Sequence, residues 1–169
     1  MPTSAQLGSL LLSESEADAA TGYSNPQSGR RELYDPRTSN VCLGFTVMSN
    51  KVADDAFRAF DGARSEETIA SEATSFYAGG AGEYIRGMID FVGRCQFQVR
   101  PPGSVLGDEM VRFTFGGQAG APFGDVILFR KGCVVLQVVT VLYTGEHSSV
   151  ADDLAAAVAK RASTLVTCT

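Results

Sequence analysis

The stretch DVILFRKGCVVLQVVTVLY, residues 125–143, decides the fold. Two predominantly apolar runs, 125–130 and 133–143, flank the dipeptide Lys131-Gly132. A short Gly-containing connection between two such runs is a strong signal of a β-hairpin. The stretch therefore predicts a pair of antiparallel strands, to which the rest of the chain must be fitted.

Further strands are expected upstream of this hairpin. Residues 109–115 alternate Met110, Arg112 and Thr114 with three apolar side chains, which is the period-two pattern of a half-buried strand. Residues 68–77 and 96–100 show weaker patterns of the same kind, and residues 41–48 are rich in β-formers. The sequence thus predicts a sheet with several antiparallel strands.

Helices are expected between and after these strands. Residues 81–92 carry apolar side chains at three- and four-residue steps, and a helix from Ser149 to about residue 165 shows a similar stripe. We also expect a short helix over 52–60, with Ala53, Phe57 and Phe60 on one side. The element order predicts an α+β fold, a twisted antiparallel sheet with helices packed on one face.

The N-terminal region reads as a small helical cap over residues 1–22. Residues 6–12 form an apolar run, and Ser13 opens a capping box whose helix should stop at Gly22. Residues 23–40 contain two Pro and no period, so we expect an irregular surface loop there. Residues 41–169 complete the α+β core of a single domain spanning 1–169.

Composition excludes some classes of partner. The 169 residues include 44% hydrophobic and 20% charged residues, as a globular domain does, and the net charge is −5. Because nucleic acids and anionic lipids are bound through Lys and Arg, we expect neither as a direct partner. The longest apolar stretch is too short to span a bilayer.

Four cysteines lie far apart, at Cys42, Cys95, Cys133 and Cys168, with no metal-ligand spacing and a single histidine. We therefore expect disulfides, no metal and an oxidising compartment. Export needs a leader or anchor, which residues 1–13 do not resemble, so we expect one to precede Met1 in the natural protein. Sequence alone permits three pairings, and an alternative is one disulfide with two buried free thiols.

Several segments resemble a known family. GDEMVRFTF (107–115), DVILFRKGCVVLQVVTV (125–141) and DLAAAVAKRAS (153–163) resemble the second half of the PknH-like extracellular sensor domain family of actinobacterial lipoproteins and receptor kinases. SEATSFYAGGAGEYIRGMIDFVGRC (71–95) and LGSLLLSESEADAATGYS (7–24) resemble its upstream strand-helix segment and its leucine-rich lead. The resemblance covers most of the chain.

This resemblance implies two disulfides, Cys42 with Cys95 and Cys133 with Cys168. It also implies a secreted or cell-surface domain of an actinobacterial envelope protein, membrane-anchored in its full-length form. The excess of Arg over Lys and the abundant Ala agree with a high-GC genome. No cofactor is implied.

The residues themselves offer little catalytic chemistry. His147 reads as a surface-loop residue, since no nucleophile elbow accompanies it. Gly79-Gly80-Ala81-Gly82 reads as a tight strand-to-helix turn because it lacks the Lys and Ser/Thr of a phosphate-binding loop. The adjacent acidic pairs at 54–55, 66–67 and 152–153 read as helix caps and solvated faces, so we expect no enzymatic activity.

Arg30, Arg31 and Arg37 in the long loop are weak candidates for binding an anionic group, although solvated loop charges are the favoured interpretation. We expect a non-enzymatic, extracytoplasmic sensor-type domain that binds a small or lipidic ligand between this loop and an open sheet face. The alternative is an envelope protein-protein interaction or structural lipoprotein, which would present a flat apolar patch. Oligomeric state is not set by the sequence.

Overall fold

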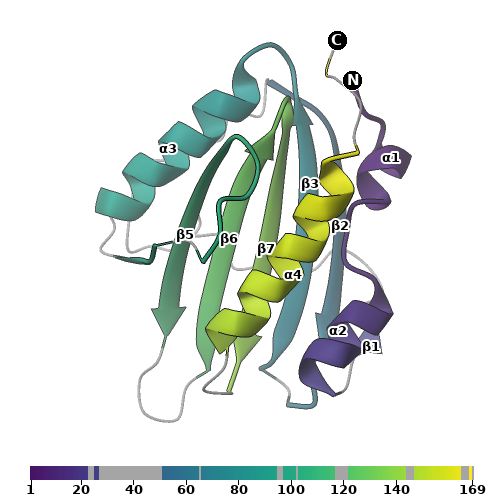
Figure 1. Cartoon of the computed structure of the whole chain (residues 1–169), viewed down its shortest axis with the longest axis vertical. Helices are drawn as coiled ribbons and strands as arrows, with labels where there is room; N and C mark the ends of the chain where they lie inside the picture. The colour runs from purple at the N-terminus through teal and green to yellow at the C-terminus, as the bar shows by residue number, and fades with distance from the viewer. Residues whose placement is uncertain are drawn as a thin grey trace.

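The computed structural model describes residues 1–22, 25–26, 51–64, 66–94, 97–101, 103–116, 122–143, 147–164 and 168. Its centre is a seven-stranded sheet in the order β1-β2-β3-β7-β6-β5-β4, antiparallel throughout (Figure 1). The strands are β1 (Asn25–Pro26), β2 (Val52–Asp61), β3 (Thr68–Phe76), β4 (Gln98–Val99), β5 (Glu109–Gly116), β6 (Phe123–Lys131) and β7 (Val134–Leu142). The α+β class and the hairpin at Lys131-Gly132 are confirmed.

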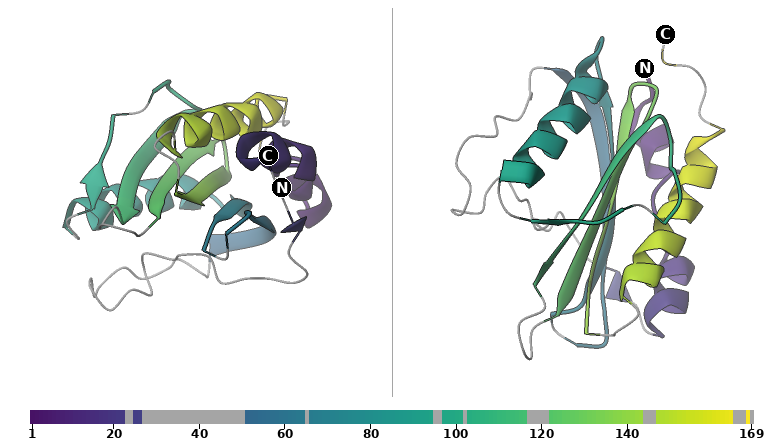
Figure 2. Two further views of the ribbon diagram at one scale, coloured as in Figure 1. Left: turned by 90° about the horizontal axis from the view of Figure 1, so that it is seen from below. Right: turned by 60° about the vertical axis from the view of Figure 1, so that its left-hand side comes forward.

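Helices cover both faces of this sheet, so the expectation of helices on one face was wrong. The helices are α1 (Ser4–Gly8), α2 (Glu14–Thr21), α3 (Gly80–Arg94) and α4 (His147–Ala162). Figure 2 shows α3 on one side of the sheet and α4 on the other, with α1 and α2 beside α4. The two helices therefore enclose the central strands between them.

Helices cover both sides of the sheet because the central strands carry apolar side chains on both of their faces. Ile127 and Phe129 of β6 pack with α4, whereas Val126 and Leu128, one residue out of phase, pack with α3. Strand β7 alternates in the same way. Because successive side chains of a strand point to opposite faces, a continuous apolar run requires a cover on each face. The apolar runs on either side of Lys131-Gly132 already contained this signal.

The N-terminal cap agrees with its prediction. Ser13 caps α2 in a capping box with Glu16, and Gly22 ends the helix with φ 70°. Arg161 of α4 donates to the Leu10 carbonyl at 3.0 Å and to the Glu16 carboxylate at 2.6 Å. Burial alone raises the pKa of Glu16, but the hydrogen bonds from Arg161 and Ser13 outweigh it and lower that pKa.

Residues 52–61 form strand β2, so the predicted helix over 52–60 was wrong. Phe57 lies opposite Glu72 and Phe60 opposite Ile69 of β3, which puts the two rings on opposite faces of the sheet. The apolar side chains of this segment have a helix-like spacing, but the segment does not form a helix. A long neighbouring strand overrides such a weak local preference by offering a complete hydrogen-bonded ladder.

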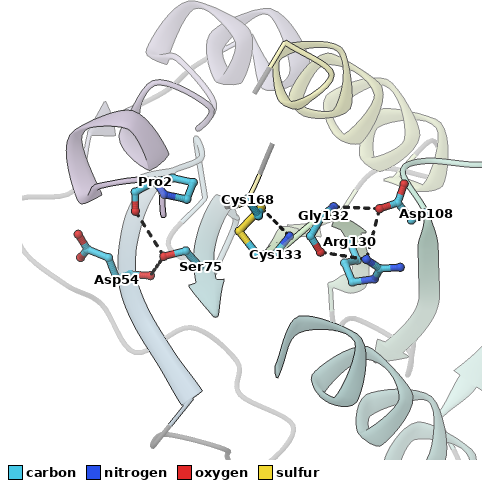
Figure 3. The surroundings of a disulfide bond; sticks show 8 residues. All are labelled: Pro2, Asp54, Ser75, Asp108, Arg130, Gly132, Cys133 and Cys168. Atoms are coloured by element: carbon cyan, nitrogen blue, oxygen red, sulfur yellow. Dashed lines mark hydrogen bonds and ion pairs between the residues drawn. A yellow bond between two sulfur atoms is a disulfide. The ribbon is translucent and has the colours of Figure 1, made fainter. Parts of the chain in front are cut away.

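One of the two expected disulfides lies within the described residues and is confirmed. Cys133, in the β6–β7 turn, bonds Cys168, which follows α4 (Figure 3). The turn itself is held by the Asp108 carboxylate, which accepts from the Gly132 N–H at 2.9 Å and pairs with Arg130 at 3.3 Å. The bond therefore fastens the end of the chain to the central hairpin.

Other expectations fall beyond the described residues. These are the strand over 41–48, the pairing of Cys42 with Cys95, and the loop over 23–40 except Asn25–Pro26, which form the short strand β1 instead of irregular chain. Strand β4 is shorter than the predicted 96–100, and α4 begins two residues before the expected cap at Ser149.

Candidate functional site

A pocket opens on the α3 face of the sheet. It lies where β3 ends and where β2, β7 and α3 begin. Its volume is about 270 Å³. The described residues that line it are Val52, Asp55, Glu72, Thr74, Phe76, Tyr84, Val135 and Gln137. Three strands and one helix thus contribute to a single concave site, which is where small-molecule sites usually form.

A β-bulge in β2 shapes this pocket. Val52 lies opposite Phe76 and Asp55 lies opposite Thr74, with the register shift between Val52 and Asp54. In a regular strand, residues three apart point to opposite faces, but one extra residue brings both Val52 and Asp55 to the pocket side. Asp55 belongs to the regular part of the ladder with β3, so what the bulge adds to the pocket wall is Val52.

The aromatic wall comes from the β3–α3 connection. The Phe76 and Tyr84 rings are in contact, with their centroids 5.4 Å apart. Lys51 closes this end through an ion pair with Glu83 of α3 at 2.7 Å. A Cβ on Gly80 would lie 3.0 Å from Lys51 and 3.1 Å from Phe76, so glycine lets α3 start this close to β2 and β3.

The polar wall comes from neighbouring strands. Glu72 of β3 lies directly opposite Gln137 of β7, and Asp55 of β2 lies diagonally across from Glu72. Thr74 donates its hydroxyl to the Glu72 carboxylate at 3.3 Å. Two carboxylates, an amide and a hydroxyl thus face one cavity whose remaining described lining is apolar or aromatic.

A second polar cluster lies on the opposite face, at the start of α4. Arg112 of β5 donates to both oxygens of Asp152 at 2.7 and 2.9 Å, and it pairs with Asp125 of β6 at 3.2 Å. Asp125 is fully buried and also contacts His147 and the Ser148 hydroxyl. These contacts supply the several partners that a buried carboxylate needs, and they join α4 to two strands.

This cluster corrects the expectation that His147 is a surface-loop residue. Its side chain is only 13% exposed, stands in the first turn of α4 and stacks on the Phe123 ring at 4.5 Å. The Nδ1 atom faces both the Asp125 carboxylate and the Ser148 hydroxyl, the latter at 3.4 Å. A catalytic relay needs the acid and the nucleophile on different ring nitrogens, so this arrangement does not form one.

The acidic pairs also differ from their prediction. Asp54 and Asp55 lie on a strand rather than a helix, and the Asp54 carboxylate accepts from the Ser4 N–H at 2.6 Å. Glu67 is buried and accepts from the Tyr143 N–H at 3.3 Å. Asp152 belongs to the Arg112 cluster. Asp54 and Asp55 serve separate roles because neighbours on a strand point to opposite faces.

The other sequence candidates have mixed outcomes. Arg30, Arg31 and Arg37 lie outside the described residues, so their binding role stays a prediction. Gly79 adopts a positive φ of 76° in a tight turn between β3 and α3, as expected. Within the described part of the chain, no group of three or more His, Cys, Asp or Glu side chains is placed to hold a metal.

The residues of the pocket were missed at the level of sequence. Glu72 and Gln137 are the signal that was available, because each is a large polar residue within an otherwise small or apolar strand. Asp55 could not be found in this way, since residues 52–60 were expected to be a helix and they form a strand. None of the helices in the described ranges is long and apolar enough to cross a bilayer.

Comparison with known proteins gives one informative result. No protein-family model and no curated protein matches the sequence. The structure is similar to the crystal structure of the extracellular domain of PknH from Mycobacterium tuberculosis, with a TM-score of 0.65 and 16% sequence identity. The likeness covers 97% of this chain and 98% of that one. The chain therefore shares the fold of that extracellular domain over nearly its whole length.

Proposed function

We propose that this chain is a non-enzymatic, extracytoplasmic sensor-type domain that binds a small ligand in the pocket between β2, β3, β7 and α3. The observation that carries the proposal is the pocket itself, with aromatic and polar walls supplied by elements far apart in the sequence. Its volume, about 270 Å³, suits a small molecule rather than a lipid chain.

The compartment is supported by two further observations. The Cys133–Cys168 bond is of the kind that persists in oxidising surroundings. The shared fold is that of a protein whose structure is described as an extracellular domain. As part of the same proposal, Cys42 and Cys95 form a second disulfide, and the domain belongs to an anchored envelope protein of the PknH-like sensor family.

The alternative, a protein-interaction or structural role, expects a flat apolar patch. The large apolar side chains that are exposed among the described residues come from separate segments. They include Ile89 of α3, Val99 of β4 and Phe123 of β6. Exposed apolar residues are common on protein surfaces, so the pocket is the better-supported site.

The test is native mass spectrometry of the protein purified from its own host. We expect a retained small molecule, and we expect Thr74→Trp to abolish retention because an indole would fill the pocket. Ala156→Trp adds the same indole to an exposed position of α4 and should retain the ligand. A ligand that remains bound to the Thr74→Trp variant, or a protein with no retained molecule and no pocket response to any small-molecule probe, would overturn the proposal.

A further inference from the structure

One side chain of the pocket is polar although most of its neighbours are apolar. Gln137 of β7 lies between Val135 and Val139 on the α3 face of the sheet, and both valines are buried. Across the sheet it lies opposite Leu128 of β6 on one side and Glu72 of β3 on the other. All of these neighbours except Glu72 are apolar. An amide in such surroundings is unfavourable unless it finds a hydrogen-bonding partner.

The Gln137 amide has no such partner within the described part of the chain. It is half-buried and lines the cavity, yet no hydrogen bond joins it to a side chain or to the backbone there. The two carboxylates of the lining differ in this respect. Glu72 accepts the Thr74 hydroxyl at 3.3 Å, and Asp55 and Glu72 each have a further interaction. The amide of Gln137 is therefore the group that a ligand can pair without displacing an existing contact.

The chemistry of an amide limits what can pair with it. Its edge presents one acceptor, Oε1, beside one donor, an N–H of Nε2. A ligand that carries a donor next to an acceptor in one plane can form two hydrogen bonds with this edge, as adenine does with Asn and Gln. A ligand with only one of these groups leaves part of the amide unpaired in an apolar setting, which is unfavourable.

The aromatic wall of the pocket suits a flat ligand. Phe76 and Tyr84 line the same cavity as Gln137. Their ring centroids are 5.4 Å apart and their planes are tilted by 40°. A flat ring can stack on one of them and meet the other at its edge, which are the arrangements that aromatic rings prefer. A cavity of about 270 Å³ has room for one such ring with small substituents.

Resting on the function proposed above, we infer that the ligand of this pocket is a flat ring that carries an amide N–H beside its C=O, as cyclic amides and nucleobases do. The ligand N–H donates to Oε1 of Gln137, and the ligand C=O accepts from Nε2. The ring lies against Phe76 or Tyr84. The same edge of the ligand lies beside Glu72, the residue directly opposite Gln137.

The experiment compares three probes of nearly equal size: 2-pyridone, 4-pyridone and 1-methyl-2-pyridone. Only 2-pyridone has its N–H beside its C=O, because its isomer carries the two groups at opposite ends of the ring and the methyl derivative has no N–H. Each probe is titrated into ¹⁵N-labelled protein while amide shifts are followed by NMR. We expect saturable shifts on β2, β3 and β7 near the pocket with 2-pyridone, and affinities at least about fivefold lower with the other two.

Variants assign the preference to one side chain. Gln137→Leu should lower the affinity for 2-pyridone at least about fivefold and abolish the preference over 4-pyridone. It should not lower the free energy of unfolding, because leucine suits the apolar neighbours. Gln98→Leu removes the same amide from an exposed site on β4 and should leave the affinity unchanged. Urea unfolding and amide spectra away from the pocket report whether each variant is folded.

The outcomes separate the two proposals. The inference is overturned if either control probe binds the pocket as tightly as 2-pyridone, or if 2-pyridone gives no response. It is equally overturned if folded Gln137→Leu keeps the preference for 2-pyridone. In these cases a molecule retained from the host and lost in Thr74→Trp would still uphold ligand binding. Absence of any retained molecule and of any probe response removes both.

Discussion

Removal of the Cys133–Cys168 bond should lower the free energy of unfolding by an amount that depends on how far apart the two cysteines are in the sequence. The two residues are 35 positions apart. Closing a loop of this length in the unfolded chain corresponds to about 4 kcal/mol at 25 °C in the loop-entropy description. The bond also fastens the segment after α4 to the β6–β7 turn. Within the described residues, no other covalent bond links these two parts of the chain.

The assay is equilibrium urea unfolding of the oxidised protein and of the double variant Cys133→Ser/Cys168→Ser. With an m-value of about 2 kcal/mol/M, the midpoint of the variant should fall by about 2 M. The double variant is preferable to a reducing agent, because a reductant would also break the second disulfide proposed between Cys42 and Cys95. A midpoint shift below about 0.5 M would refute the reasoning and weaken the argument for an oxidising compartment.

Three further predictions concern the packing around the sheet. Asp125→Ala should lower the unfolding free energy by about 3 kcal/mol, because Arg112 is left buried with one of its two carboxylate partners missing; a loss below about 1 kcal/mol in urea unfolding would contradict this role. The hydrogen bond from the Gly132 N–H is the main cause that lowers the pKa of Asp108 below 3.8, so its stabilising effect is complete above pH about 3.8 and is lost as pH falls through the lowered value. Asp108→Asn should therefore flatten the acid limb of a stability-pH profile, and an unchanged limb would argue against it. Gly124→Ala would place a Cβ 2.1 Å from the Phe115 ring and should cost about 1–3 kcal/mol in thermal unfolding, whereas an unchanged melting temperature would show that the ring moves freely.

The sequence predicted those elements whose signal is local. The Lys131-Gly132 turn, the apolar stripe of α3 and the capping box at Ser13 each depend on residues close together in the chain. Ile89 shows the limit even there, since it fits the helical stripe of α3 but is 46% exposed. An apolar stripe indicates which side of a helix faces the core. How many residues of that stripe are buried depends on the strands that the helix packs against.

Long-range features could not be predicted in the same way. The strand β2 forms because β3 offers a ladder, although Ala53, Phe57 and Phe60 alone are compatible with a helix. The burial of His147 depends on Asp125, which is 22 positions away. Both faces of β6 and β7 are apolar in the sequence, which indicates a cover on each side, but helices were expected on one face only and that prediction was wrong.

The pocket illustrates why a binding site was harder to predict than the fold. Its lining is spread from Val52 to Gln137, and the pocket-facing position of Val52 depends on a one-residue bulge. Polar residues inside apolar strands, such as Gln137, are the pattern that sequence analysis can use for this purpose. They indicate a place where a strand side chain faces something other than a hydrophobic core.

A crystal structure of the protein purified from its own host, without added ligand, tests the central claim most directly. The account predicts electron density for a small molecule in the pocket, against the Phe76 and Tyr84 rings and within hydrogen-bond distance of Asp55 or Glu72. An empty pocket with a host molecule bound at another surface would contradict it.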